Sequence, residues 1–493
     1  MLNEIVNRTN NYIKNMPKVQ RKKYGQFFTS KETAEFMANL LTIPKDKEKI
    51  RFLDPGAGTG ILSCALIERL ESIESIRCIE VVCYETDETV LKLLKDNLKY
   101  CKKMSKKTIE FSIFNKNYIV KQNTDFNNKI DVPKDLKYDL IIGNPPYMKI
   151  SKNSEEALSM SEICYGTPNL YFLFAAMSLF NLKDGCEMVY IIPRSWTSGV
   201  YFKKFRKYFL SEGKLKHIHL FISRNKIFEK EDVLQETIII KIKKEKKTDE
   251  DITVTTSKSN SDFHELTKIE IPYNLIVAGE ELYVYLITNK EELNVLKKLH
   301  KLKHTLPEIG LKMKTGLTVD FRNKDFLRNK PEKDSVPLFY SEHIKQGEIS
   351  FPIQKENEYI LNSKKGLIQK NKNYLFVKRF TSKEEKRRLQ CGIYLSKDYP
   401  EYTEISTQNK INFIDSLNQE MSEATVYGLY VLFNSTLYDK YYRILNGSTQ
   451  VNSTEINSMP IPNLKNIESL GSQLLKSRNL SEKNCNLILE EII

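Results

Sequence analysis

The sequence predicts an α/β fold with a mostly parallel sheet in the first half of the chain and a separate mixed α+β domain in the second. Short apolar runs alternate with helical patterns from residue 50 to residue 242. Strands that alternate with helices are typical of a parallel sheet covered by helices on both faces. The alternation stops at a charged, Ser/Thr-rich stretch over residues 243–262, and shorter, irregular pieces rich in aromatic residues follow.

Each expected element follows from its local pattern. Bounded apolar runs predict strands at residues 50–53, 78–84, 108–114, 138–142, 187–192, 216–222 and 237–242. Helical spacing of apolar residues predicts helices at residues 61–70, 89–99 and 169–180, and we expect the last to be buried because it is apolar nearly all round. Residues 426–445 read as one long amphipathic helix, which Asn446 and Gly447 end.

The length of the chain and its change of character predict two domains. A chain of 493 residues is too long for one ordinary hydrophobic core. We expect a first domain over residues 1–245, a connecting segment over residues 246–290 and a second domain over residues 291–493.

The composition narrows the classes of function. Lys and Arg number 77 against 63 Asp and Glu, and the net charge of +14 favours a polyanionic partner, nucleic acid first. A generally Lys-rich proteome would give the same balance. No apolar run approaches a membrane span, and residues 1–20 lack the apolar core of a secretory signal. The cysteines form no CxxC pair, which indicates free thiols in a reducing cytosol.

A Gly-rich turn and an acidic strand end predict a nucleoside site. The turn after the first strand reads Asp54, Pro55, Gly56, Ala57, Gly58, Thr59 and Gly60. Its glycines let the backbone approach a ligand, and its spacing favours a nucleoside without a pyrophosphate. Glu85 follows the second strand, where a carboxylate can accept hydrogen bonds from both ribose hydroxyls, and Asp87 is the alternative.

The most informative segment follows the expected strand at residues 138–142 and reads Gly143, Asn144, Pro145, Pro146 and Tyr147. An aromatic amine is a poor nucleophile because its lone pair is delocalised into the ring. Two acceptors, the Asn144 side-chain oxygen and the Pro145 carbonyl, would draw the nitrogen toward tetrahedral geometry and aim its lone pair at a methyl group on sulfonium. The prolines stiffen the backbone and Tyr147 offers a face on which a base can stack. An ordinary Pro-rich turn would not explain the whole set.

In the order of these motifs the chain resembles the amino-group DNA methyltransferases of the γ arrangement. The segment before the Gly-rich turn looks like the family's first motif and reads Gly25, Gln26, Phe27, Phe28 and Thr29. The resemblance implies a Rossmann-like methyltransferase domain with S-adenosylmethionine as cofactor and a C-terminal target-recognition domain. It implies that Thr29 helps to hold the methionine part of the cofactor, with Asp54, Pro55, Gly56, Gly58 and Glu85 completing the site.

Two further positions are interpreted through the same resemblance. Residues 224–228 look like a later motif in which an aromatic residue, here Phe228, stacks on the extruded base opposite Tyr147. A phenylalanine of the core would look the same in sequence. The family usually has an acidic residue after the third strand that accepts from the cofactor's adenine amine, and here Asn117 takes that place. An amide carbonyl accepts the same bond without charge assistance.

The second half is similar to modification methylases of the PstI and Eco57I types. The matching segments lie at residues 337–343, 377–387 and 432–462. The resemblance implies site-specific methylation of adenine N6 in double-stranded DNA, on a base extruded from the helix, with or without a separate restriction endonuclease. Arg pairs with guanine, and Asn and Gln pair with adenine. The candidate DNA contacts are therefore Arg379, Arg388, Gln450 and Asn452, although most such side chains contact phosphate or solvent.

Other functions share parts of this pattern. The Asn-Pro-Pro-Tyr turn also occurs in enzymes that methylate a glutamine amide of release factors, but these are shorter and lack a large basic C-terminal domain. Methylation of RNA is a nearer alternative, because composition does not distinguish it. A catalytically silent DNA-binding subunit is disfavoured by the intact turn, and a fused nuclease by the lack of an extra domain.

Overall fold

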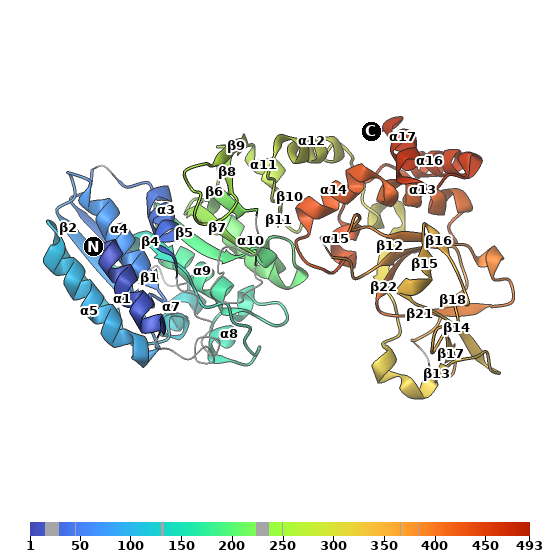
Figure 1. Ribbon diagram of the computed structural model, residues 1–493, viewed down its shortest axis with the longest axis horizontal. Coiled ribbons are helices and arrows are strands. Elements are labelled where there is room, and N and C mark those ends of the chain that lie inside the picture. The colour runs from blue at the N-terminus through green and yellow to red at the C-terminus, as the bar shows by residue number, and fades with distance from the viewer. Residues whose placement is uncertain are drawn as a thin grey trace. The chain divides into compact units, whose positions relative to one another are not determined.

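The computed structural model describes residues 1–14, 29–44, 46–129, 133–222, 236–248, 250–364, 366–382 and 384–493 (Figure 1). The chain divides into two compact units, Met1–Thr288 and Asn289–Ile493. Each unit has its own sheets and its own helices.

The first unit is built on a nine-stranded sheet in the order β3-β2-β1-β4-β5-β7-β6-β8-β9. Its strands are β1 (Lys49–Pro55), β2 (Cys78–Tyr84), β3 (Thr108–Phe114), β4 (Tyr138–Gly143), β5 (Leu182–Pro193), β6 (Lys214–Phe221), β7 (Thr237–Lys243), β8 (Ile252–Ser257) and β9 (Thr267–Ile271). The five strands from β3 to β5 in that order run parallel, whereas β7 runs antiparallel to β5. The predicted α/β fold with a mostly parallel sheet is confirmed, and each strand expected from the sequence is present.

Helices pack against this sheet because its strands are apolar on both faces. On β4, Leu140 and Ile142 belong to a core cluster with α3 (Lys31–Leu40) and α4 (Ile61–Glu71), whereas Ile141 between them does not. Near this cluster lie α1 (Leu2–Lys14), which contacts α3 and α4, and α5 (Glu88–Met104), which contacts α4.

A second group of helices surrounds α9 (Leu170–Asn181), which contacts α6 (Tyr118–Lys121), α10 (Lys203–Glu212) and β5. As expected, α9 is buried over almost its whole length. Two short helices, α7 (Asn123–Asn127) and α8 (Glu155–Ser159), complete the set. Within the described ranges, no helix is both long enough and apolar enough to cross a membrane.

The segment at residues 246–290, expected to connect the two domains, belongs to the first unit instead. Its strands β8 and β9 extend the sheet beyond β6, and α11 (Tyr273–Ile276) and the hairpin of β10 (Val277–Ala278) and β11 (Tyr283–Val284) follow. The prediction was wrong because β8 is built largely from Thr and Ser, and its hydroxyls pair with buried histidines. Thr255 Oγ1 lies 2.8 Å from His217 Nε2 and 2.9 Å from His219 Nδ1.

The strand order reverses direction between β1 and β4. From β1 the chain moves outward through β2 to β3, then returns to place β4 on the other side of β1. The register pairs Pro55 with Tyr84 and Tyr84 with Phe114, so these strands end level with one another. Ligands of open α/β sheets bind at the carboxyl ends of the strands at such a switch point.

The second unit combines two sheets with a helical cluster. One sheet has the order β12-β22-β19-β20-β16-β15 and the other has the order β13-β17-β14-β21-β18. The strands are β12 (Leu311–Thr315), β13 (Leu327–Arg328), β14 (Ser335–Phe339), β15 (Ile344–Lys345), β16 (Glu348–Ile349), β17 (Tyr359–Leu361), β18 (Gln369–Lys370), β19 (Tyr374–Lys378), β20 (Cys391–Tyr394), β21 (Glu404–Thr407) and β22 (Ile411–Ser416). The helices are α12 (Lys290–Leu299), α13 (Glu423–Asn434), α14 (Thr436–Leu445), α15 (Ser453–Asn457), α16 (Leu464–Ser477) and α17 (Glu482–Glu490).

The single helix expected over residues 426–445 is two helices, so that prediction was wrong. Ser435 is extended, with ψ of 151°, and it separates α13 from α14. Its hydroxyl accepts from the backbone N–H of Tyr438 at 3.2 Å and so caps α14. A serine within an apolar helical pattern can start a new helix because its oxygen replaces a missing backbone acceptor.

The helices α13 and α16 approach each other through glycine. A Cβ on Gly428 would lie 1.9 Å from the carbonyl oxygen of Ile467, and one on Gly471 would lie 1.8 Å from that of Ala424. These oxygens are backbone atoms, so the helices must separate to admit even a methyl group.

Gly428→Ala is therefore expected to destabilise the second unit by about 1 to 3 kcal/mol, the range typical of an overpacked core. Far-UV circular dichroism should show a lower melting temperature, and fluorescence of Trp196, the one tryptophan, reports the first unit separately. Ser472→Ala changes an exposed position on α16 and serves as the control. A Gly428→Ala protein that melts like the Ser472→Ala protein would contradict the close approach.

Candidate active site

Asn144 stands at the carboxyl end of β4, where the strand order switches. Its side-chain Nδ2 donates to Thr29 Oγ1 at 3.0 Å, across 115 residues of sequence. Its side-chain oxygen accepts from the hydroxyl of Tyr147 at 2.8 Å. The fold thus brings together two residues that the sequence assigned to separate motifs, and it fixes the orientation of the Asn144 amide from both ends.

Tyr147 points into the protein. Its hydroxyl also lies 3.0 Å from the carbonyl oxygen of Ile191 on β5, and its ring meets Tyr171 of α9 edge-on at 6.4 Å between centroids. Burial raises the pKa of the Tyr147 phenol far above its ordinary value, so the hydroxyl remains a donor. Pro145 is buried and Pro146 is half-buried.

Asp54 lies beneath the Gly-rich turn and is fully buried. Its Oδ2 accepts from the Ser63 hydroxyl at 2.6 Å, whereas its Oδ1 has no hydrogen-bond partner. Burial raises the pKa of this carboxyl to about 7. The turn itself passes through the left-handed region, with φ of 55° at Gly58, and the space beside the Gly58 Cα is open.

Glu85 ties the Gly-rich turn to the end of β2. One carboxylate oxygen accepts from the N–H of Gly58 at 2.8 Å, and the other accepts from the N–H groups of Thr86 and Asp87, both at 2.8 Å. Burial is the main reason that its pKa is raised. A carboxylate has about four lone-pair positions, so these bonds use most of the capacity that was expected to serve two ribose hydroxyls. The alternative, Asp87, caps α5 by accepting from the N–H of Thr89 at 2.9 Å.

Asn117 is arranged differently from the expectation. Its side-chain oxygen accepts from the backbone N–H groups of Ile119 at 3.1 Å and Val120 at 3.3 Å and so caps α6. These two bonds take up the oxygen that was expected to accept from an adenine amine. Its Nδ2 donates to Glu156 Oε1 of α8 at 2.8 Å.

Glu156 lies beside Asn117, and the sequence did not reveal it. It is half-buried and lies 39 residues from Asn117 along the chain. No motif marks it, since α8 is a short helix and one Glu among its acidic residues carries no signal. The structure places its carboxylate beside Asn117, where the sequence pattern lacks an acid.

In the second unit, two of the four predicted DNA-contacting residues lie close together. Arg379 donates from Nη1 to the carbonyl oxygen of Asn409 at 3.0 Å, and its own carbonyl accepts from the N–H of Val451. Gln450 pairs with Phe380 in an isolated β-bridge, which places Gln450 next to Arg379. Asn452 is half-buried, and its Nδ2 lies 3.3 Å from Glu455 Oε1.

Arg388 does not reach a surface, so its assignment to DNA contact was wrong. It is fully buried, and its guanidinium donates to Thr381 Oγ1 at 3.1 Å and to the carbonyl oxygen of Ser448 at 2.7 Å. The guanidinium also lies over the Tyr442 ring at 5.6 Å. Burial lowers its pKa. Arg388 therefore holds together the two loops that carry Thr381 and Ser448.

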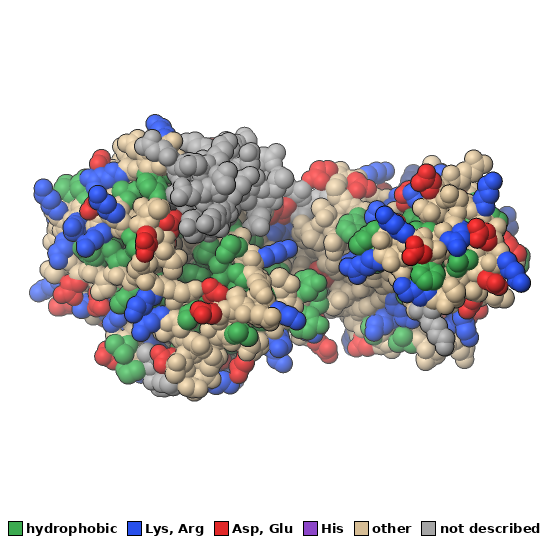
Figure 2. Space-filling view, turned by 90° about the horizontal axis from the view of Figure 1, so that it is seen from below, with side chains coloured by type: hydrophobic (Ala, Val, Ile, Leu, Met, Phe, Trp, Pro, Cys, Tyr) green, Lys and Arg blue, Asp and Glu red, His purple; other side chains and the backbone are tan. Residues whose placement is uncertain are grey.

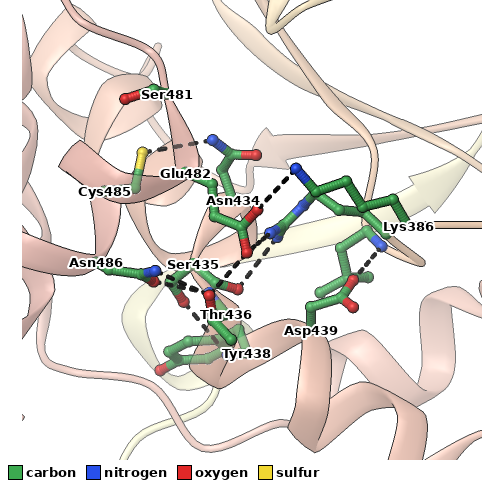
Figure 3. Close-up of polar contacts among 12 residues, drawn as sticks. Lys386, Asn434, Ser435, Thr436, Tyr438, Asp439, Ser481, Glu482, Cys485 and Asn486 are labelled. Atoms are coloured by element: carbon green, nitrogen blue, oxygen red, sulfur yellow. Dashed lines mark hydrogen bonds and ion pairs between the residues drawn. The ribbon is translucent and has the colours of Figure 1, made fainter.

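The neighbouring basic residues are also engaged within the unit. Arg387 donates to the carbonyl oxygens of Phe433 at 2.9 Å and Ser435 at 3.1 Å and pairs with Glu482 at 3.1 Å. Figure 3 shows Lys386 beside the same Glu482, at 3.8 Å. On the face drawn in Figure 2, Lys and Arg are interspersed with Asp and Glu. The positive excess is not gathered into one patch there.

Some of the expected residues lie outside the described part of the chain. These are Phe228 with the rest of residues 224–228, and the residues Gly25, Gln26, Phe27 and Phe28. Among the residues that the structure does describe, no group of three or more His, Cys, Asp or Glu could hold a metal ion.

The switch-point sheet, the Gly-rich turn after β1 and the Asn-Pro-Pro-Tyr turn after β4 place the protein in the class of S-adenosylmethionine-dependent methyltransferases. The comparisons specify this class further. Residues 62–228 match the family described as "Eco57I restriction-modification methylase". The chain is 33% identical to the Type II methyltransferase M.PstI of Providencia stuartii over 92% of this chain and 90% of that protein.

It is also 34% identical to the Type II methyltransferase M.BsuBI of Bacillus subtilis, over 95% of this chain and 94% of that one. The chain therefore belongs to the family of Type II restriction–modification methyltransferases, which methylate DNA. A similar fold occurs in a nuclease-deletion mutant of the Type ISP restriction–modification enzyme LlaGI, with a TM-score of 0.50 and 13% identity over 92% of this chain and 54% of that one.

Asp54 predicts a pH dependence of stability. Its pKa rises from 3.8 to about 7 on folding, so the folded state holds the proton more tightly than the unfolded state. Its contribution to stability is present in full below about pH 4 and is lost as the pH rises through about 7. Asp54→Asn should therefore gain stability relative to the native protein between about pH 5 and about pH 8.

Urea denaturation followed by fluorescence of the buried Trp196 measures this difference in the first unit. Asp96→Asn, at an exposed carboxylate of α5, is the matched control and should show no such change. If Asp54→Asn and the native protein differed in stability by the same amount at about pH 5 and at about pH 8, the role of burial would be refuted.

Proposed function

We propose that the protein is a site-specific DNA adenine-N6 methyltransferase that uses S-adenosylmethionine and acts on a base extruded from double-stranded DNA. The observation that carries the proposal is the Asn144 amide, held between Thr29 and Tyr147 at the carboxyl end of β4. Asn144 lies at the switch point of the sheet, at the same edge as the Gly-rich turn that follows β1.

The chemistry follows from the orientation of this amide. With Nδ2 committed to Thr29 and one lone pair of the side-chain oxygen taken by the Tyr147 hydroxyl, the second lone pair of that oxygen would accept from an incoming amine, and the Pro145 carbonyl would supply the second acceptor. The two acceptors orient the amine and stabilise the positive charge that develops on its nitrogen as the methyl group arrives. The N–C bond would form as the S–C bond to the methyl group breaks, with S-adenosylhomocysteine as the leaving group, and the nitrogen would release a proton to water to give the neutral methylated amine.

The residues around the Gly-rich turn fit the cofactor. Gly58 has open space beside it, Gly56 is half-exposed, and the buried Oδ1 of Asp54 beneath the turn has no partner, so these residues would accept a polar ligand. Pro55, Glu85 and Thr29 would complete the site. S-adenosylmethionine supplies an activated methyl group on its sulfonium when bound. Glu85 acts partly by holding the turn through the N–H of Gly58.

Glu156 is the acceptor that we propose for the cofactor's adenine amine. Asn117 cannot serve through its oxygen, which caps α6, but its Nδ2 fixes Glu156 Oε1 at 2.8 Å. The other carboxylate oxygen of Glu156 then supplies the charge-assisted bond that Asn117 lacks. In this arrangement Asn117 positions Glu156.

The proposed extrusion of the base gives a role to two aromatic residues. Tyr147 and Phe228 would hold the extruded adenine and offset part of the few kcal/mol that unstacking costs. The hydroxyl bond from Tyr147 to Ile191 fixes the ring in its place beside Asn144. Arg379, Gln450 and Asn452 of the second unit would contact the DNA.

The length of the similarity favours DNA over a protein substrate. The release factor glutamine methyltransferase of Fusobacterium nucleatum is 29% identical over 134 residues, which is 27% of this chain. The Type II methyltransferases match both units. Pairing with a separate restriction endonuclease and action without one are both compatible with these residues.

Transfer of labelled methyl groups to an unmethylated double-stranded DNA library, with mapping of the product at base resolution, tests the function. N6-methyladenine at one recurring sequence is expected. Label in RNA or protein and none in DNA would overturn the substrate, and methylcytosine would overturn the base.

Asn144→Ala should lower the rate of methyl transfer by about 100-fold or more, the loss typical of removing one charge-stabilising group. Cofactor affinity, measured by calorimetry, should change little. Asn153→Ala alters an exposed asparagine of the same region and serves as the control. An equal loss of transfer and of cofactor affinity would contradict the role of Asn144.

Glu156→Gln should weaken S-adenosylhomocysteine binding by about 10-fold, since a charge-assisted hydrogen bond becomes a neutral one. The discriminating ligand is S-inosylhomocysteine, which carries an oxygen in place of the amine. The native protein should prefer S-adenosylhomocysteine strongly, and Glu156→Gln should reduce that preference because its side-chain N–H can donate to the oxygen. Glu155→Gln, the exposed neighbour, is the control. An unchanged preference in Glu156→Gln would refute the assignment.

A further inference from the structure

Two exposed phenylalanines line one pocket in the second unit. Phe321 is 69% exposed and Phe380 is 45% exposed, and both border a cavity of about 560 Å³. Leaving a phenylalanine in water forgoes the stabilisation that its burial would give. Single exposed apolar residues are common, but two that converge on one pocket indicate a surface that another molecule covers.

Hydrogen bonds to buried residues hold the loops that carry these rings. Phe321 lies in a short turn whose Asp320 carboxylate accepts from Nε2 of the buried Gln408 at 2.7 Å. Phe380 is held by its bridge to Gln450, and the adjacent Thr381 is tied down by Arg388. Rings on such supports lose little freedom when a ligand binds.

The charge around the pocket suits a polyanion. Arg322 lies over the Phe321 ring at 5.4 Å, and Arg379 lies over the Phe380 ring at 5.5 Å. Lys324 and Lys410 line the pocket and are exposed. Among the residues that line the pocket, the two cations Lys324 and Lys410 accompany one carboxylate, Asp320, which already accepts from Gln408. Apolar rings flanked by cations match duplex DNA, whose sugars and thymine methyl groups offer apolar surface in the grooves while its phosphates attract Lys and Arg.

We infer that this pocket, which we call the Phe321–Phe380 pocket, is a DNA-binding site of the second unit. In it the two rings contact bases or sugars of the duplex, while Arg322, Lys324, Arg379 and Lys410 contact phosphates. The inference rests on the proposed function and adds further residues to Arg379, which the sequence had already suggested as a DNA contact. Arg388 and Gln450 take part by holding the loop of Phe380 in place.

Binding of duplex DNA that contains the mapped target, measured by fluorescence anisotropy with S-adenosylhomocysteine present, tests the inference. Phe321→Ala and Phe380→Ala should each weaken binding by about 5-fold or more, as truncation of an important aromatic contact at an interface does. Leu417→Ala removes another exposed apolar side chain of this unit and should bind like the native protein. Phe380→Leu keeps apolar bulk without the ring and should fall between the native protein and Phe380→Ala.

The cations give a second, independent readout. Lys324→Ala and Lys410→Ala should each reduce the slope of log affinity against log salt by about one, the effect of one lost phosphate contact. Lys476→Ala, at an exposed position on α16, should leave the slope unchanged. DNA carrying 5-iodouracil near the target should photo-crosslink to peptides that contain Phe321 or Phe380.

The outcomes separate this inference from the proposed function. If the native protein methylates and binds DNA and the phenylalanine variants bind it equally well, the pocket is not a DNA site and the proposed function stands. Retained DNA binding with loss of a co-purifying protein would assign the pocket to a protein partner and would also overturn the inference. Failure of the native protein to bind DNA would overturn both. Unchanged S-adenosylhomocysteine binding and melting show that each variant is folded.

Discussion

The strand order changes direction between the parallel strands β1 and β4. Because no connection crosses between the loops at the carboxyl ends of these two strands, a gap is left there. Every assigned element of the candidate active site lies at this edge. The Gly-rich turn leaves β1, the loop of Glu85 leaves β2, the segment of Asn117 follows β3, and the turn of Asn144 leaves β4. The sheet thus brings together groups that are distant from one another along the chain.

Hydrogen bonds that cross between these loops then fix the local geometry. Glu85 binds the N–H of Gly58, so the loop after β2 holds the turn after β1. Asn144 is held by Thr29 on one side and Tyr147 on the other. An amide that is bonded at both ends cannot rotate freely, and the orientation of its oxygen is set before any ligand arrives.

The second unit uses the same principle with buried cations. Arg388 is removed from solvent and bonds to backbone and side-chain oxygens of two loops, so its charge stabilises their conformation. Arg387 does the same at the junction of α13 and α14. Two consecutive basic residues, Arg387 and Arg388, are thus bound within the unit. In the proposed binding mode, the exposed rings and cations near Phe380 are the part that reaches the DNA.

The sequence by itself determined the α/β class, the strands of the parallel sheet, the two turns and the family resemblance, since each depends on local periodicity or on a contiguous motif. Tertiary structure alone decided which polar residues are buried. The polar strand β8 can lie in the sheet because the Thr255 hydroxyl forms hydrogen bonds with His217 and His219. Ser435 divides an apolar helical pattern by capping α14. Glu156 stands beside Asn117, and Arg388 lies in the interior. Local sequence carries no record of partners that are distant along the chain, and burial depends on those partners.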